Sequence, residues 1–336
     1  DYLDGTPGRL MMSLKSVLGS SLMDDKTVIF NELIPYTDVL KHFMQHLKST
    51  AENSLGRELT QVILGRPVHF DDDNLDKDQI AQDTLEKIAR KIGFKEILFQ
   101  YEPIAAALSY ETQITQEKLA LIIDMGGGTS DFTVIRLNTK KTNTDRAQDV
   151  LANCGIHIAG TDFDKRLSLN SVMPLLGMGS KLRGTTSNLD MPVYYYHDLT
   201  TWHTLNNLYD KKTITHLLTL QASAYEKQLI ERLISVLRKR AGHRILHSVE
   251  TAKQNLSSLT STQIDLSFIE EELNAIITRG SFDEIIHDDT NKIIKTIKDT
   301  IKQANVKYTD IEAIFYTGGT SKIPLIRNQI DGLFPN

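Results

Sequence analysis

The sequence predicts an α/β protein with two lobes, and three observations lead to this prediction. The chain has 336 residues, which is long for a single hydrophobic core and favours two. Short aliphatic runs of strand length alternate with segments of helical periodicity. Acidic or glycine-rich segments follow several of these runs where the expected strands end, and open α/β sheets bind their ligands at such strand ends.

The composition is that of an ordinary globular protein, and it excludes several functional classes. Hydrophobic residues make up 40% of the chain and charged residues 24%, which is typical of globular domains. The net charge of −5 gives no basic field to attract nucleic acid. No apolar run is long enough to cross a bilayer, and the single cysteine, Cys154, fits a reducing compartment. We therefore expect a cytoplasmic protein without nucleic-acid or membrane partners.

After an irregular segment over residues 1–35, the first part of the chain predicts alternating helices and strands. In order, these expected elements are a helix at 37–55, a strand at 59–64, a helix at 75–92, a strand at 96–100 and a helix from 103. Glu102 closes the second strand, and its carboxylate either caps the following helix or faces a crevice shared with other strand ends. Lys15 lies in a short amphipathic segment, where its ammonium is either solvated or directed at an anion.

The stretch over residues 119–137 carries the clearest chemical signal. An aliphatic strand ends at Asp124, three glycines and Thr129 follow, and a second apolar strand begins near Asp131. Consecutive glycines let a ligand approach the backbone closely, and the N–H groups of such a hairpin can converge on an anion. Asp124 could hold a metal ion through water, so the pattern predicts a phosphate with its divalent cation. The alternative is a glycine-rich hairpin without a ligand.

This glycine segment differs from two common nucleotide-binding patterns. No Gly-Lys-Ser/Thr follows it, as a P-loop would require. A strand follows the glycines where the Rossmann fingerprint has a helix.

The second part of the chain predicts a further set of strands and helices around an irregular segment at 177–210. The expected elements are a strand at 148–158, a helix that opens over 159–164 with Thr161 as its cap, helices at 214–240 and 244–258, a strand at 262–268, a helix at 280–304, a strand at 311–316 and a helix at 323–332. Residues 317–321 form a second glycine turn before the last helix. Backbone N–H groups and a helix N-terminus would point at one spot there.

These segments resemble, in the same order, motifs of the ATPase domain of DnaK-type (seventy-kilodalton heat-shock) chaperones. The matching segments are residues 14–19, 102–107, 124–131, 159–164, 250–258 and 317–324. That domain belongs to the actin, sugar-kinase and heat-shock superfamily. The resemblance implies an actin-like fold of two duplicated ribonuclease-H-like domains, with mixed sheets flanked by helices and ATP in the cleft between the lobes.

The resemblance also implies a role for each matching residue. The catalytic residues would be Lys15, which orients the γ-phosphate and the attacking water, together with Glu102 and Thr129. The residues that organise magnesium and its waters would be Glu102, Asp124 and Asp131. The residues that hold the phosphates would be Gly126, Gly127, Gly128, Thr129 and Ser130. The other cofactor-binding residues, mostly on the nucleoside side, would be Gly160, Glu250, Lys253, Ser257, Gly318, Gly319, Thr320 and Lys322. The implied cofactors are ATP or ADP with Mg²⁺, and K⁺ is a candidate second ion.

By the same resemblance, residues 1–112 form the first lobe and 113–336 the second. Residues 160–284 would be the outer subdomain of the second lobe, with a long insertion over 177–245. The family's first phosphate loop would lie before the chain start, its last adenosine segment after the chain end, and no peptide-binding domain follows.

Two departures from the family affect adenine recognition. Gln254 and Lys322 stand where the family has arginines. Because lysine lacks the planar guanidinium that stacks on a ring, the selectivity for adenine is in question.

The expected function is that of an ATP-binding, weakly ATP-hydrolysing protein of chaperone type without a peptide-binding domain. Phosphoryl transfer requires mainly positioning and charge neutralisation, which the acids and Lys15 would supply. One alternative is a nucleotide-dependent sensor or scaffold that does not hydrolyse ATP. A second is a small-molecule kinase of the same superfamily, for which no acceptor site is evident in the sequence. Beyond nucleotide, protein clients and co-chaperones are the candidate partners.

Overall fold

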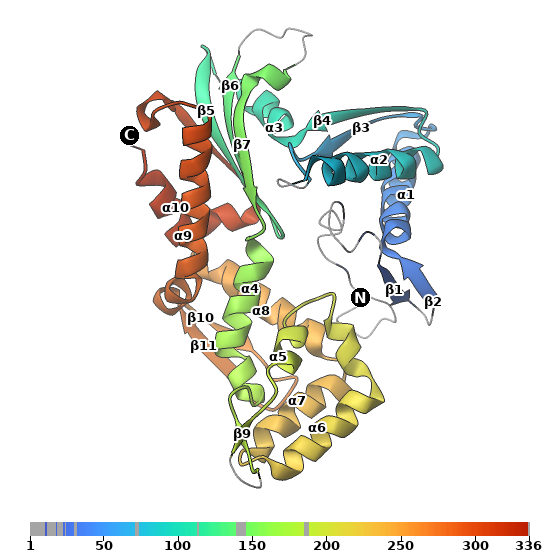
Figure 1. Cartoon of the computed structure of the whole chain (residues 1–336), viewed down its shortest axis with the longest axis vertical. Coiled ribbons are helices and arrows are strands. Elements are labelled where there is room, and N and C mark those ends of the chain that lie inside the picture. The colour runs from blue at the N-terminus through green and yellow to red at the C-terminus, as the bar shows by residue number, and fades with distance from the viewer. Residues whose placement is uncertain are drawn as a thin grey trace. The chain divides into compact units, whose positions relative to one another are not determined.

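The computed structural model describes most of the chain, in two compact units (Figure 1). The described residues are 11, 18, 23, 25–29, 32–70, 74–112, 114–138, 146–184 and 188–334. What we call the helical unit comprises the described residues of Asp1–Met12, Gly160–Asn291 and Lys322–Ile326. What we call the sheet unit comprises the described residues of Ser13–Ala159, Lys292–Ser321 and Arg327–Asn336.

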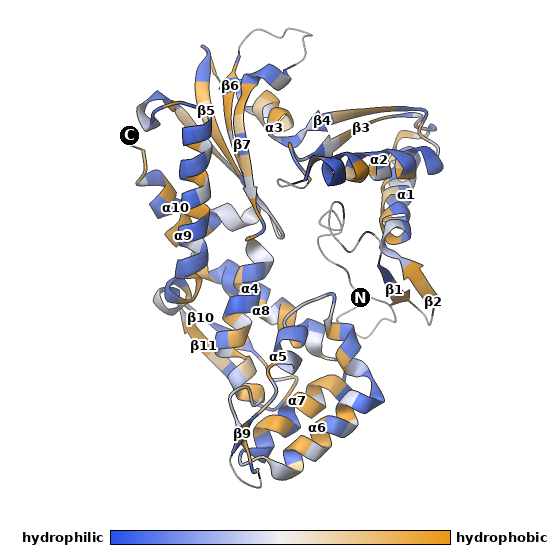
Figure 2. Cartoon of the chain, viewed as in Figure 1, coloured by the Kyte–Doolittle hydropathy of each residue, from blue (hydrophilic) through white to orange (hydrophobic). Residues whose placement is uncertain are grey.

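The sheet unit is built on a four-stranded mixed sheet with the strand order β12-β5-β6-β7. Its strands are β5 (Lys118–Met125), β6 (Ser130–Leu137), β7 (Val150–Ile156) and β12 (Ala313–Thr317). β12 is parallel to β5, whereas β5, β6 and β7 pair antiparallel. These strands are largely apolar (Figure 2). Helix α3 (Glu102–Glu111) packs on one face of this sheet. The core formed there is Ile104, Ala107, Ala120, Ile122, Ile135 and Leu137.

The same unit holds a parallel pair of strands and two long helices. These elements are α1 (Tyr36–Leu55), β3 (Gln61–Arg66), α2 (Leu75–Lys91) and β4 (Glu96–Tyr101). Helix α1 ends at Gly56, whose φ of 64° is the left-handed conformation that glycine adopts readily. Helix α2 begins after Asn74, whose side chain accepts hydrogen bonds from the backbone N–H groups of Asp76 and Lys77, both at 3.1 Å. This cap is the physical reason that the helix begins there.

The helical unit contains five helices that lie wholly within it and two small antiparallel sheets. The helices are α4 (Gly160–Ser171), α5 (Tyr194–Leu199), α6 (Lys211–Ser223), α7 (Lys227–Arg238) and α8 (Gly242–Leu256). The sheets pair β8 (Lys181–Leu182) with β9 (Leu189–Asp190), and β10 (Ser261–Asp265) with β11 (Asn274–Thr278). Two helices at the end of the chain contribute residues to both units: α9 (Arg279–Gln303) and α10 (Pro324–Asp331).

The structure confirms most of the expected helices and strands to within one to three residues at their ends, but it corrects several expectations. The segment at 177–210, expected to be irregular, contains β8, β9 and helix α5. Helix α4 begins at Gly160, before its expected cap, Thr161. Residues 26–35, expected to be irregular, contain the antiparallel pair β1 (Lys26–Ile29) and β2 (Glu32–Pro35). The helix expected at 214–240 is two helices, because Ala224 is extended (φ −71°, ψ 144°) and forms a β-bridge with Leu182. Strand β11, which pairs with the expected strand β10, was missed.

Among the described helices, none is both long and apolar enough to span a membrane.

Candidate functional site

Two glycine-rich turns lie next to each other at one end of the four-stranded sheet. The first joins β5 to β6, and the second follows β12. Because β12 is parallel to β5, with Thr317 opposite Asp124, the chain leaves both strands at the same edge. The turns are also joined directly, since the Thr320 hydroxyl donates to the carbonyl oxygen of Gly126 at 2.8 Å. The sheet therefore brings together two motifs that are almost two hundred residues apart in the sequence.

The glycines of these turns differ in what the fold requires of them. Gly318 has φ +79°, and a Cβ there would lie 2.1 Å from the Met125 carbonyl oxygen. No other residue can take that place. Gly126 and Gly319 do not have positive φ. A Cβ on Gly126 would lie no closer than 3.8 Å to another atom, and one on Gly319 would have nothing within 4 Å. Neither the backbone nor the packing of the described residues requires glycine at these two positions.

The first turn is closed by its own backbone. The N–H of Gly126 donates to the carbonyl oxygen of Thr129 at 3.0 Å. Ser130, predicted to hold phosphate, is buried, and its hydroxyl donates to the Ile158 carbonyl oxygen at 2.7 Å. Both groups therefore shape the turn through hydrogen bonds within the protein.

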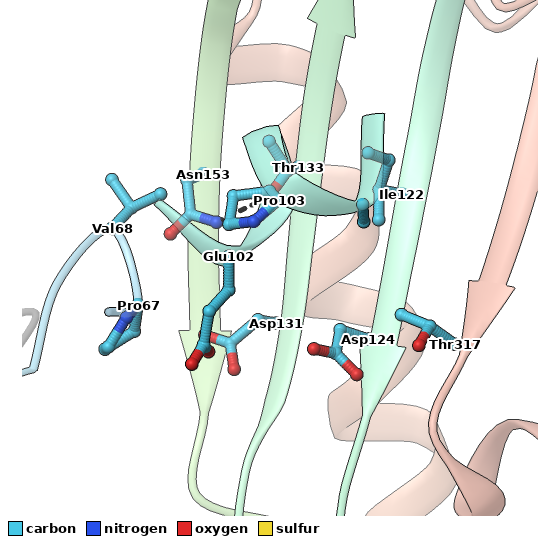
Figure 3. A pocket seen from close by; sticks show the side chains of 11 residues that line it. Pro67, Val68, Glu102, Pro103, Ile122, Asp124, Asp131, Thr133, Asn153 and Thr317 are labelled. Atoms are coloured by element: carbon cyan, nitrogen blue, oxygen red, sulfur yellow. Dashed lines mark hydrogen bonds between the residues drawn. The ribbon is translucent and has the colours of Figure 1, made fainter. Parts of the chain in front are cut away.

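Three carboxylates face a cleft beside these turns (Figure 3). Asp124 and Asp131 are opposite each other on β5 and β6, and Glu102 is the first residue of α3. Gly65, at the end of β3, leaves room for Glu102, because a Cβ there would lie 3.2 Å from its Oε1. The residues that line the cleft are Pro67, Val68, Glu102, Pro103, Ala106, Ile122, Asp124, Asp131, Thr133, Asn153 and Thr317.

The negative charge of the cleft also affects the neighbouring Tyr110. Burial raises the pKa of the Tyr110 phenol, and the negative charge of Asp124 raises it further. Within the described ranges, no group of three or more His, Cys, Asp or Glu side chains could hold a metal ion directly. The acids therefore fit an ion that keeps most of its water, as Mg²⁺ commonly does.

Sequence reasoning missed two polar residues of the cleft, Thr133 and Asn153. They are opposite each other on β6 and β7, and Asn153 Nδ2 donates to Thr133 Oγ1 at 2.7 Å. The sequence gives only a weak signal for them, because each is a polar residue in a strand whose other residues are mostly apolar or of mixed polarity. Nothing in the local pattern shows that the two strands bring these side chains together.

The predicted nucleoside-side residues on α4 and α8 belong to the helical unit. Lys253 is buried, and its Nζ donates to the Gly160 carbonyl oxygen at 2.9 Å and to Asp164 Oδ2 at 2.7 Å. Burial raises the pKa of Asp164 to about 6, against the opposing attraction of Lys253. Glu250 accepts a hydrogen bond from the Gln254 amide at 3.3 Å. The Lys253 ammonium is thus held between two oxygens of its own unit.

The other predicted residues of this group have simpler surroundings. Ser257 is the C-cap residue of α8, and the Lys322 side chain is exposed. Lys15, the predicted catalytic lysine, lies outside the described residues.

A comparison with protein families shows which family has this arrangement of motifs. The family model described as "Hsp70 protein" matches residues 23–173 and 207–336. These ranges contain every predicted site residue except Lys15, and they leave out residues 174–206 of the helical unit. The mixed sheets flanked by helices fit the actin-like ATPase fold of that family, whose members bind nucleotide, typically with Mg²⁺. The chain belongs to the Hsp70 family and is a DnaK-like, ATP-binding protein of chaperone type.

Proposed function

We propose that the chain binds ATP or ADP with Mg²⁺ at the two glycine turns and hydrolyses ATP slowly, as a chaperone-type ATPase. The observation that best supports this proposal is the pair Gly126 and Gly319. Both have ordinary φ and room for a Cβ, so the fold does not require glycine there. A ligand that approaches the main chain closely does require it, and phosphate groups bind to such turns.

The acids would bind the metal ion, and the glycines would bind the phosphate groups. Glu102, Asp124 and Asp131 would hold Mg²⁺ through its waters, and the ion would neutralise charge on the transferred phosphoryl group. Thr129 and the glycines before it would contact the phosphates, and K⁺ is a candidate second ion. Lys15 would act on the γ-phosphate and the attacking water.

The residues of α4 and α8, with Gly318 to Lys322, would contact the nucleoside side. The first lobe would comprise residues 1–112 and the second 113–336. Because Gln254 and Lys322 replace stacking arginines, base selectivity would be weak. Clients or co-chaperones in the cytoplasm are the proposed protein partners, and binding of client peptides would require a domain other than this one.

The test of nucleotide binding compares two neighbouring glycines. Mg-ATP at a hundred times its Kd should stabilise the wild type by about 2.7 kcal/mol, measured as a rise in Tm that EDTA reduces. Gly319→Ala should leave the nucleotide-free Tm unchanged or raise it, since replacing glycine at a compatible φ stabilises by about 0.4–1 kcal/mol. It should also reduce the shift caused by Mg-ATP, because the methyl group occupies the space of the ligand.

Gly318→Ala is the matched control, one residue away. It should lower the nucleotide-free Tm, because its φ of +79° and the Met125 carbonyl oxygen exclude a Cβ. If wild type shows no shift at millimolar Mg-ATP, or if Gly319→Ala shifts as much as wild type, nucleotide does not bind at these turns.

A nucleotide sensor that does not turn ATP over is the second candidate function. Single-turnover phosphate release from bound ATP distinguishes the two functions. Binding without release on the timescale of hours would support the sensor.

A further inference from the structure

The sheet face under α3 changes from apolar to acidic along its strands. Ile122, Thr133 and Asn153 form one row across β5, β6 and β7. Asp124 and Asp131 form the next row on the same face, roughly 7 Å further along the strands. The first of these rows lies between the apolar core and the acids, and it carries a polar pair beside an isoleucine.

The polar pair is oriented by one hydrogen bond. Asn153 Nδ2 donates to Thr133 Oγ1 at 2.7 Å. Thr133 is only 1% exposed, whereas Asn153 is partly exposed and lines the cleft together with Glu102 (Figure 3). With its nitrogen committed to Thr133, the Asn153 carboxamide keeps its oxygen as an acceptor. No described residue donates to that oxygen.

Packing alone does not explain this pair. Ile122 in the same row is 1% exposed and fully apolar, so the row can be filled by hydrocarbon. A neutral hydrogen bond contributes little net stability, and an apolar pair of the same shape can be equally stable. The property that an apolar pair would lack is an acceptor directed at the cleft.

We propose that Asn153 is a further catalytic residue, whose Oδ1 accepts a hydrogen bond from the water that attacks ATP, and that Thr133 is the positioning residue behind it. This inference rests on the proposed function. In the reaction, the water oxygen bonds to the γ-phosphorus while the bond from that phosphorus to the β–γ bridging oxygen breaks. ADP leaves, and the protons of the water remain with the released phosphate. Thr133 fixes which end of the carboxamide faces the water, and Glu102 lines the same cleft.

The test measures single-turnover ATP hydrolysis and equilibrium ATP binding on the same variants of the protein. Asn153→Leu keeps a similar volume and removes the acceptor. It should slow hydrolysis about tenfold, the effect of one lost hydrogen bond, with ATP affinity within twofold of wild type. Thr133→Val should slow hydrolysis about threefold, because the carboxamide stays but loses its orienting partner. Thr133→Ser keeps the hydroxyl and should match wild type.

A double variant separates this role from a structural one. Asn153→Leu with Thr133→Val should be no slower than Asn153→Leu alone, because the threonine acts only through the asparagine. The inference is overturned if Asn153→Leu hydrolyses ATP at the wild-type rate, or if its loss appears in affinity instead of rate. If wild type binds ATP but does not release phosphate, this inference fails while nucleotide binding stands. If wild type does not bind ATP, both fail.

Discussion

Lys253 and Asp164 form a buried ion pair, and burial disfavours the ionised form of the Asp164 carboxyl group. Burial is the largest influence and raises the pKa of Asp164 from 3.8 to about 6. The Lys253 ammonium lowers this pKa, while the carboxylates of Glu250 and Asp162 raise it again. The folded protein therefore holds the Asp164 proton more tightly than the unfolded chain does. Such an acid stabilises the fold most below its unfolded pKa, and this contribution is lost as the pH rises through the folded pKa.

This residue gives a pH prediction. Between pH 4 and 7 the wild type should lose roughly 2 kcal/mol of unfolding free energy relative to Asp164→Asn, which cannot ionise. Chemical denaturation of both proteins across this pH range measures the difference. Lys253→Met should widen the loss, because it removes the cation that lowers this pKa. A difference between wild type and Asp164→Asn that is constant with pH would contradict the prediction.

Arg66 connects two elements of the sheet unit, the turn after β3 and helix α2. Its guanidinium donates to the carbonyl oxygens of Pro67 and Val68, both at 3.0 Å, and to both carboxylate oxygens of Asp78 at 2.9 and 3.0 Å. A further N–H donates to Gln82. The guanidinium also lies over the rings of Phe70 and Tyr101, at 5.1 and 5.4 Å. Because Pro67 and Val68 line the cleft, this contact fixes one of its walls.

Removing one partner of such a buried pair leaves the other charge unpaired. Arg66→Met should therefore lower the unfolding free energy by about 3–5 kcal/mol. Arg66→Lys should recover only part of this loss, since a single ammonium cannot reach Asp78, Gln82 and the Pro67 carbonyl oxygen as the three nitrogens of the guanidinium do. The matched control is Arg90→Met, which breaks an exposed pair with Glu86 on the same helix and should cost at most about 1 kcal/mol. Equal losses for Arg66→Met and Arg90→Met in urea titrations would contradict this account.

For the whole molecule, the segment 174–206 is the internal stretch between the two ranges of the family match, yet it completes the core of the helical unit. Tyr196 is fully buried, and its hydroxyl donates to the Leu176 carbonyl oxygen at 3.2 Å. A Cβ on Gly177 would lie 2.4 Å from Ile230 Cδ1 on α7. At the start of α8, a Cβ on Gly242 would lie 2.5 Å from Leu205 Cδ1. The segment is thus packed as closely as the matched residues around it.

If this segment is part of the core, Tyr196→Ala should lower the unfolding free energy by about 3–5 kcal/mol, as for other large buried aromatics. Tyr196→Phe should cost about 1 kcal/mol, the value of its hydrogen bond. Leu189→Ala in the same segment is the control: Leu189 is 59% exposed, and the change should stay within about 0.5 kcal/mol. An unchanged Tm for Tyr196→Ala would show that the segment packs independently of the core.

Local patterns in the sequence predicted much of the fold and part of the site. Helix α2 begins directly after Asn74 because an asparagine cap satisfies two backbone N–H groups, and such a signal spans only a few residues. The glycine turns after β5 and β12 could also be predicted, because each is likewise a pattern of a few consecutive residues. The break at Ala224 was not, because no glycine or proline marks it. The chain bends there to pair with Leu182, forty-two residues earlier.

The sequence by itself determined the α/β class, the order of the elements, the acids at the strand ends and the resemblance to the heat-shock ATPases. Tertiary structure alone decided which residues meet. The register of β6 and β7 brings Asn153 to Thr133, and the packing of α4 on α8 brings Asp164 to Lys253. The tertiary structure also shows that the two neighbouring glycines differ. Gly318 must be glycine because a Cβ would clash with the Met125 carbonyl oxygen, whereas nothing in the described fold requires glycine at 319. Periodicity and capping act within a few residues, whereas these contacts depend on strand register and helix packing over distances that local patterns do not encode.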